Sequence, residues 1–159
     1  MVLLEHAIFL SLAETYKDTV FRIALNYLGN TYDADDIVQD VLMKLFISNK
    51  HFASDDHARY WIIRVTINTC KNVLRSSWKN KNLSLDESVA TTSFEQKDQE
   101  SLYLIVMGLP EKYRTVLYLF YYEEFSVKEI SKILKLKVTA VTTRLSRARE
   151  QLKEVWKDE

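Results

Sequence analysis

The stretch VKEISKILKLKVTAVTTRLSRAREQL, residues 127–152, decides how the C-terminal part of this chain folds. Its apolar spacing predicts two helices joined by a tight turn. Ser126, followed three residues later by Glu129, is a capping box that marks the start of the first helix. Thr139 is predicted to cap the second helix. That helix has an apolar seam in which residues recur at helical spacing: Val141, Leu145, Ala148, Leu152 and Trp156.

The face of the second helix opposite this seam is rich in hydroxyls and arginine. Between Lys135 and Arg149 there are five basic residues and no acidic one. A helix that enters the major groove of DNA uses such side chains for base edges and phosphates, and a preceding helix braces it. The pattern therefore predicts a helix-turn-helix, with a surface helix hairpin carrying a solvated charged face as the alternative. The candidate duplex-DNA residues are Thr139, Thr142, Thr143, Ser146 and Arg147.

Composition favours an all-α protein without redox or metal chemistry. Apolar residues make up 47% of the 159 residues, and only two glycines and one proline interrupt the helical patterns. The single Cys70 and the three scattered histidines have no metal-ligand spacing, so we expect no metal and no cofactor. Neither a signal peptide nor a window long enough to span a bilayer is evident, so we expect a cytoplasmic protein.

The net charge is zero, but the charges are unevenly distributed. Residues 1–50 carry a net charge of −3, residues 51–81 carry +4, residues 82–100 carry −4 and residues 101–159 carry +3. Two basic segments, 51–81 and 101–159, thus alternate with two acidic segments, 1–50 and 82–100. This alternation indicates a protein that meets nucleic acid at two places and another partner elsewhere.

The first module reads as three helices. The first, over 4–28, has an apolar stripe that includes Ile8, Val20 and Ile23, and ends at Gly29. The second, over 34–47, is predicted to be capped by Asp33. Its exposed face carries an acidic cluster that is either a partner surface or a solvated helix face with favourable dipole charges. The cluster comprises Asp35, Asp36, Gln39 and Asp40.

The third helix, over 57–79, follows a polar loop at 48–56. Its inward arc is predicted to hold Ile62, Val65, Thr66, Cys70, Val73 and Leu74. Cations and an amide on the opposite face, beside aromatic rings, are typical of a surface that binds single-stranded nucleic acid. An ordinary amphipathic helix is the alternative. The candidate residues are Arg64, Asn68, Lys71 and Arg75.

The chain is therefore expected to form two small helical domains, 1–80 and 99–159, joined by a flexible acidic linker over 81–98. In the second domain Pro110 is predicted at the first position of a helix that runs to about residue 124. Four residues of this helix are expected to form the core against which the helix-turn-helix packs: Val116, Leu117, Phe120 and Tyr121. Neither a phosphate loop nor a nucleophile with a neighbouring base is evident, so we expect no catalytic residue and no small-molecule substrate.

Four motifs in order carry a resemblance to a known family: YDADDIVQDVLMKLF, YWIIRVTINTCKNVLR, LPEKYRTVLYLFYYEEFSVKEISKIL and TRLSRAREQLK. Together they resemble a sigma-70 family sigma factor of RNA polymerase, of the extracytoplasmic-function group, which keeps the second and fourth sigma domains. The resemblance covers nearly the whole chain. In two places the chain departs from the family pattern: Lys135 stands where the turn usually has glycine, and Thr142 stands at a position that is usually basic.

The resemblance implies a role for each candidate surface. The acidic cluster of Asp35, Asp36, Gln39 and Asp40 would bind the clamp helices of the largest polymerase subunit. Arg64, Asn68, Lys71 and Arg75 would capture and melt the minus-10 element, and the loop over 48–56 would hold a flipped base. Thr142, Thr143, Ser146 and Arg147 would read the minus-35 element as duplex. An anti-sigma partner, of a kind that is often membrane-anchored, is also implied.

Two rival functions remain open on the sequence alone. A dimeric helix-turn-helix regulator would bind operators tightly without polymerase and with half-site symmetry. A helical adaptor without a DNA role would have no salt-dependent affinity for nucleic acid. The preferred interpretation is a non-enzymatic sigma factor that binds core polymerase and promoter DNA.

Overall fold

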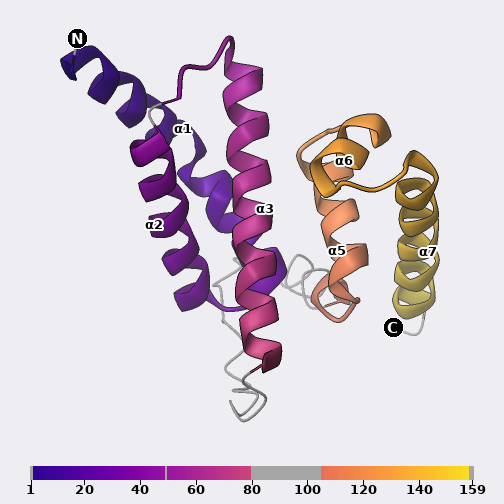
Figure 1. The fold of residues 1–159 in the computed structure, drawn as a ribbon. Helices are drawn as coiled ribbons and strands as arrows, with labels where there is room; N and C mark the ends of the chain where they lie inside the picture. The colour runs from indigo at the N-terminus through magenta and orange to yellow at the C-terminus, as the bar shows by residue number, and fades with distance from the viewer. Residues whose placement is uncertain (1, 49, 80–104, 158–159) are drawn as a thin grey trace. The chain divides into compact units, whose positions relative to one another are not determined.

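The computed structural model describes residues 2–48, 50–79 and 105–157, and all regular structure in these ranges is helical (Figure 1). Contacts divide the chain into two compact units. The all-α prediction is confirmed. The predicted flexible linker over 81–98 lies outside the described residues, and the expected domain bounds stay a prediction. The helices are α1 (Val2–Leu28), α2 (Thr31–Ser48), α3 (Asp55–Lys79), α5 (Glu111–Leu117), the π-helix η1 (Tyr118–Tyr122), α6 (Val127–Leu134) and α7 (Val138–Lys157).

The N-terminal unit is a bundle of three helices in which α1 packs against both α2 and α3 (Figure 1). The bundle core is formed by the second half of α1, one face of α2 and a wide arc of α3. Burying these aliphatic side chains provides the main favourable free energy of folding, since each large one contributes about 1.5–3 kcal/mol. Fully buried members include Val20, Ala34, Val41, Ile63 and Ile67.

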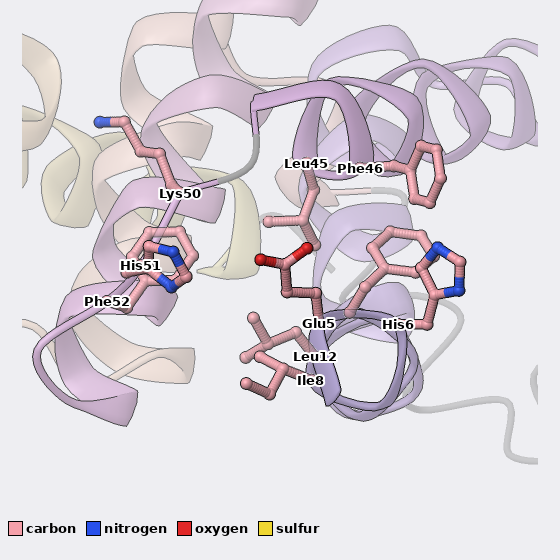
Figure 2. Close-up of a pocket in the computed structure, with 10 residues that line it drawn as sticks. Glu5, His6, Ile8, Leu12, Leu45, Phe46, Lys50, His51 and Phe52 are labelled. Atoms are coloured by element: carbon pink, nitrogen blue, oxygen red, sulfur yellow. The ribbon is translucent and has the colours of Figure 1, made fainter. Parts of the chain in front are cut away.

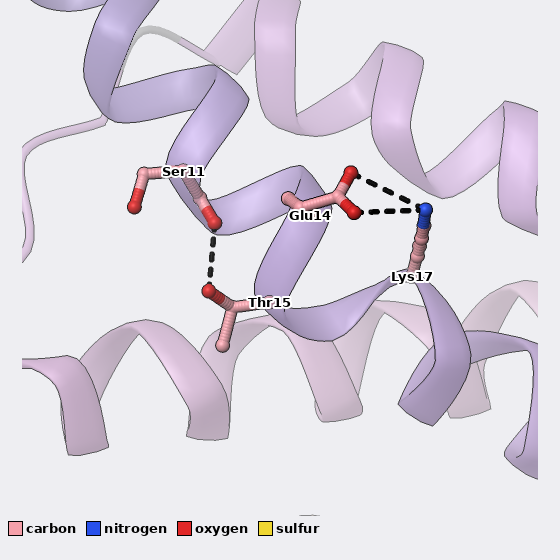
Figure 3. A network of polar contacts seen from close by, with 4 residues as sticks. All are labelled: Ser11, Glu14, Thr15 and Lys17. Carbon is pink, nitrogen blue, oxygen red and sulfur yellow. Dashed lines mark hydrogen bonds and ion pairs between the residues drawn. The ribbon is translucent and has the colours of Figure 1, made fainter.

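The first half of α1 is more exposed than its stripe predicted. Ile8 is 48% exposed, whereas Val20 and Ile23 are buried as expected. Figure 3 shows two polar contacts in the middle of this helix, and the side chains that make them are exposed. Lys17 pairs with Glu14 at 3.1 Å, and the Thr15 hydroxyl donates to the Ser11 carbonyl oxygen at 2.8 Å. Such exposed pairs contribute little to stability, so α1 is held by its second half.

The turn between α1 and α2 is built by Gly29 and Asn30. Gly29 has a φ of 70° and donates its backbone N–H to the Leu25 carbonyl, which ends α1 as predicted. The Asn30 side chain accepts from the backbone N–H groups of Tyr32 and Asp33 at 2.8 and 3.2 Å. Asn30 therefore caps α2, and the prediction that Asp33 does so was wrong. With Asn30 as its cap the helix begins at Thr31, three residues before its apolar pattern.

The buried arc of α3 is wider than the predicted one. Ile63 and Ile67 are fully buried although they were not expected to be, whereas Val73 is 36% exposed and Val65 is half-buried. The reason is that α3 packs against α1 and α2 at once, so one narrow row of apolar side chains is not wide enough to contact both helices. The hydroxyls of Thr66 and Thr69, which lie in this arc, donate to carbonyl oxygens one turn earlier.

Leu109 is the first buried residue of the described C-terminal unit, and the exposed Pro110 follows it. Pro110 is the N-cap of α5 rather than its first helical residue. After α5 the backbone widens into the π-helix η1, where the Glu123 N–H donates to the Tyr118 carbonyl five residues back. Helical phase is lost there, so the core prediction was partly wrong. Val116 and Leu117 are buried with Leu119, but Phe120 is half-buried and Tyr121 is 57% exposed.

The predicted helix-turn-helix is α6, a tight turn and α7. The capping box is present: the Ser126 hydroxyl accepts from the Glu129 N–H, and the Glu129 carboxylate accepts from the Ser126 N–H. At the turn Lys135 has a φ of 56°, the left-handed geometry that glycine adopts most easily. The next N–H, of Leu136, donates to the Ser131 carbonyl at 2.9 Å. The turn therefore adopts a left-handed residue and its closing hydrogen bond with lysine, instead of glycine, at position 135.

The start of α7 differs from the prediction. The helix begins at Val138, so Thr139 lies inside its first turn and is not the cap. Val141, Leu145 and Ala148 of the seam are buried as predicted, and Leu152 is half-buried. The prediction for the Trp156 side chain lies outside the described side chains. In the described ranges no helix is long and apolar enough to cross a bilayer.

Lys135→Gly is expected to stabilise the chain, because left-handed backbone costs a residue with a Cβ about 1–2 kcal/mol. Glycine also loses more conformational entropy on folding, so the net gain should be about 0.5–1 kcal/mol. Urea denaturation measures the free energy of unfolding of the C-terminal unit in the variant and in the wild type. The matched control is Lys132→Gly, an exposed interior position of α6 that should cost about 1 kcal/mol. Destabilisation by Lys135→Gly would contradict the turn geometry.

Candidate functional site

The acidic cluster of α2 is fully presented to solvent. Asp35, Asp36, Gln39 and Asp40 are all exposed, because Ile37 and Val41 fill the opposite, buried face. Asp40 forms an exposed ion pair with Lys44 at 3.3 Å, and Lys44 donates to the Thr69 hydroxyl of α3. The cluster thus presents two carboxylates and an amide to solvent, beside the paired Asp40.

Large apolar side chains extend this same face at both ends; the sequence pattern predicted this exposure for Met43 but not for Tyr32 or Ile47. Tyr32 is 81% exposed, Met43 57% and Ile47 70%. With Asp36 and Asp40 they follow one another at steps of three and four residues, the spacing of one helix face. Exposed apolar side chains grouped around charges are a feature of protein-binding surfaces. The helical spacing of these apolar residues relative to Asp36 and Asp40 was the signal in the sequence that could have predicted their exposure.

The candidate single-strand residues lie on one polar face of α3. Asn68 and Arg75 are exposed, and Arg64 and Lys71 are half-buried. The Arg64 guanidinium lies 5.9 Å from the centre of the Tyr60 ring, so a cation and an aromatic face are adjacent. The structure therefore brings the four residues together on one helix, next to a ring.

A pocket of about 120 Å³ lies between the start of α1, the end of α2 and the loop after α2 (Figure 2). Figure 2 shows the Glu5 carboxylate pointing into the gap between the lining residues, with Leu45 above it in the view and Phe52 across the gap. Phe52 also packs against Trp61 at 5.6 Å between ring centres. The Lys50 ammonium lies 5.6 Å over the same Trp61 ring. The loop is thus anchored to α3 by aromatic contacts and forms one wall of a cavity.

The polar face of α7 is exposed along two turns. All five candidate duplex-DNA residues are exposed, whereas the seam on the other side of the helix is buried. The five residues are Thr139, Thr142, Thr143, Ser146 and Arg147. The structure therefore assembles a continuous surface of hydroxyls and one guanidinium at the N-terminal half of α7.

A groove of about 370 Å³ runs beside this face and includes residues of α5. Lys112 and Tyr113 of α5 line it together with Thr143, Arg144 and Arg147 of α7. Sequence reasoning missed Lys112, because it lies outside the helix-turn-helix and only packing brings it to α7. The groove combines three cations, from Lys112, Arg144 and Arg147, with no acidic side chain among its described lining residues.

Arg149, on the flank of the exposed polar face of α7, contacts aromatic side chains of η1. Its Nε donates to the Tyr121 hydroxyl oxygen at 2.6 Å. Its guanidinium carbon lies 5.6 and 5.5 Å from the ring centres of Phe120 and Tyr121. In the described ranges no cluster of three or more His, Cys, Asp or Glu side chains could hold a metal ion.

Comparison with known proteins places both units in one family. The model of Sigma-70 region 2 matches residues 12–80, and the model of Sigma-70 region 4 matches residues 99–152. The extracytoplasmic-function (ECF) sigma factor SigW of Bacillus subtilis is 29% identical, over 94% of this chain and 89% of the relative. SigM of the same organism is 27% identical, over 90% of this chain and 91% of the relative.

Two solved structures share the fold. The sigma factor RpoE from Bartonella quintana, solved with the anti-sigma factor NepR, gives a TM-score of 0.75 at 19% identity, over 90% of this chain and 92% of that one. CnrH, solved with the cytosolic domain of CnrY, gives 0.71 at 21% identity, over 97% and 90%. The two matched regions, the curated relatives and the helical architecture agree, and this chain belongs to the sigma-70 family of RNA polymerase sigma factors, in its extracytoplasmic-function group.

Proposed function

We propose that this chain binds core RNA polymerase through α2 and directs it to promoters that are held at two points. The C-terminal unit would bind the minus-35 element as duplex, and the N-terminal unit would bind the minus-10 element as opened strands. One observation carries most of this proposal. The polar face of α7 is exposed over two turns while its seam is anchored in a helix-turn-helix.

The α2 face is suited to a protein partner with basic and apolar side chains. Asp35, Asp36, Gln39 and Asp40 would meet cations of the polymerase clamp helices. Met43 and Ile47 would be covered by apolar residues of the same partner, since together they expose apolar area beside the charges. The charges would set orientation and association rate, and the apolar contacts would add affinity.

The α3 face is suited to unpaired bases. Arg64, Lys71 and Arg75 would follow the strand's phosphates, and Asn68 would hydrogen-bond a base edge. Stacking of an unpaired base on an aromatic ring is worth about 1–3 kcal/mol. Tyr60, next to Arg64, is one such ring.

The pocket beside Phe52 is a site where a flipped base would be enclosed. Trapping bases there and along α3 would stabilise the opened strands. Because this mode of opening requires no bond chemistry, we infer that the chain is not an enzyme.

The α7 face is suited to duplex DNA. Thr142, Thr143, Ser146 and Arg147 would contact base edges in the major groove. Lys112, which shares the groove of Arg147, would contact a phosphate on the groove's rim. This arrangement needs no second copy of the chain. The dimeric-regulator alternative is not favoured, because both matched regions come from sigma factors.

An anti-sigma factor is a further expected partner. RpoE of Bartonella quintana was solved with the anti-sigma factor NepR, and CnrH was solved with the cytosolic domain of CnrY. By analogy, an anti-sigma segment would cover the polymerase and DNA surfaces of this chain until it is released. A membrane-anchored partner of this type would hold the chain near the membrane, on the cytoplasmic side.

Run-off transcription tests the proposal directly. Core polymerase is incubated with a library of genomic fragments from the source organism, with and without this chain. Discrete transcripts are expected only when the chain is present, and they should share two sequence elements upstream of the start. The dimeric-regulator hypothesis instead predicts duplex binding by the chain alone and no new transcripts. Absence of chain-dependent transcripts from every fragment would refute the proposed function.

The double substitution Asp36→Ala with Gln39→Ala is expected to weaken binding to core polymerase about 5- to 100-fold, because it removes one charged and one polar contact from the proposed interface. Fluorescence titration of labelled chain with core enzyme measures the affinity. Asp18→Ala, an exposed carboxylate on α1, is the matched control and should bind like the wild type. An unchanged affinity of the double variant would assign polymerase binding to another face.

Arg147→Ala and Lys112→Ala are expected to weaken promoter binding by the holoenzyme in different ways. Arg147→Ala should cost about 1–3 kcal/mol and lose discrimination at one minus-35 position, because its contact is to a base. Lys112→Ala should weaken binding to all sequences and reduce the salt dependence by about one counterion, because its contact is to a phosphate. Equilibrium binding to single-base promoter variants at several salt concentrations measures both. A uniform loss for Arg147→Ala would mark it as a phosphate contact.

A further inference from the structure

We infer that Arg149 is a positioning residue and not a DNA contact. Together with Tyr121 and Phe120 of η1 it forms what we call the Arg149 clasp, which holds the middle of α7 in the rotation that presents Ser146 and Arg147 to the minus-35 duplex. This inference rests on the proposed function of α7, and it names the residues that orient the reading face.

The clasp engages the Nε–H donor of Arg149 and places its guanidinium charge beside two aromatic rings. The Arg149 Nε–H donates to the Tyr121 hydroxyl oxygen at 2.6 Å. The guanidinium carbon lies 5.6 Å from the Phe120 ring centre and 5.5 Å from that of Tyr121, within the range of cation–π attraction. The two rings meet edge-on, at 5.0 Å and 79°. These three contacts favour the orientation in which the Arg149 side chain lies against η1, and swinging it towards a phosphate would break them.

The position of Arg149 on α7 supports the same conclusion. It follows Arg147 by two residues, and residues two apart on a helix do not share a face. It directly follows Ala148, which is fully buried in the seam. Arg149 therefore lies on the border between the seam and solvent, where a contact with η1 would fix how far α7 can rotate about its seam.

The π-helix is what brings the aromatic half of the clasp to α7. Its widened turn, closed by the Glu123 N–H bond to the Tyr118 carbonyl, takes Phe120 and Tyr121 out of the helical phase of α5. Tyr121 consequently stays 57% exposed and lies against Arg149, when an α-helical continuation was expected to bury it. Single π-turns inside α-helices are frequent at functional sites. Here the wide turn supplies the ring and hydroxyl that hold the DNA-reading helix.

The test uses full-length chain in holoenzyme, on a promoter recovered by run-off transcription. The variants are Arg149→Ala, Arg149→Lys and Tyr121→Phe, with Lys153→Ala as an exposed basic control on the same helix. Affinity is measured against salt concentration, on the promoter and on a copy with a scrambled minus-35 element. Each of the three variants should lose affinity roughly 3- to 10-fold and should discriminate less between the two templates, with an unchanged salt slope.

Arg149→Lys separates positioning from direct contact. A lysine keeps the charge and would restore a phosphate contact, but it lacks the planar group and the Nε donor that the clasp needs. Rescue by lysine, or a salt slope reduced by about one in Arg149→Ala with Tyr121→Phe unaffected, would overturn the inference. Wild-type affinity in all three variants would overturn it as well.

Hydrogen exchange of the free chain tests the clasp without DNA. Amides in the C-terminal half of α7 should exchange faster in Arg149→Ala and in Tyr121→Phe, and the double variant should be no faster than Arg149→Ala alone. Additive increases would overturn the pairing. If the wild-type holoenzyme itself ignores the minus-35 scramble, the proposed function of α7 fails, and the exchange result still decides whether the clasp exists.

Discussion

The buried seam of α7 is the constraint on which the functional surfaces of the C-terminal unit depend. Val141, Leu145 and Ala148 are buried in a helix that packs against α5 and α6, so the opposite side of α7 has to face solvent. Because the helical repeat is rigid, anchoring these three residues places every other side chain of α7 as well. Exposure of the hydroxyls and of Arg147 is a consequence of this packing, and it is the property that DNA binding requires.

Packing also determines which helix faces are exposed in the N-terminal unit, where one exposed face is acidic and another is basic. Burial of Ile37 and Val41 turns the acidic side of α2 outward, and burial of Ile63 and Ile67 does the same for the polar side of α3. One small bundle thereby presents an acidic face suited to a protein and a basic face suited to nucleic acid. A chain of zero net charge can serve both partners because packing separates its charges by helix face.

Local backbone departures in the C-terminal unit occur where helices must be aimed. Lys135 adopts left-handed geometry between α6 and α7, and η1 widens the helix that precedes them. The left-handed geometry at Lys135 carries a conformational cost for a residue with a Cβ, whereas η1 contacts α7 through side chains. The turn at Lys135 directs α7, and the π-helix brings Tyr121 to Arg149. Both departures thus lie at segments that join or contact α7.

The sequence by itself determined the helical class, the capping box at Ser126, the seam of α7 and the exposure of the candidate residues on α2 and α7, because these follow from helical periodicity and local hydrogen bonding. It also carried the family motifs. Only the tertiary structure decided the features that depend on contact between elements. It buried Ile63 and Ile67 of α3, which packs against two other helices, and it brought Lys112 of α5 beside Arg147 of α7. The spacing of apolar residues along the sequence shows which face of a helix is buried. Which other helices pack against that face depends on the folded chain.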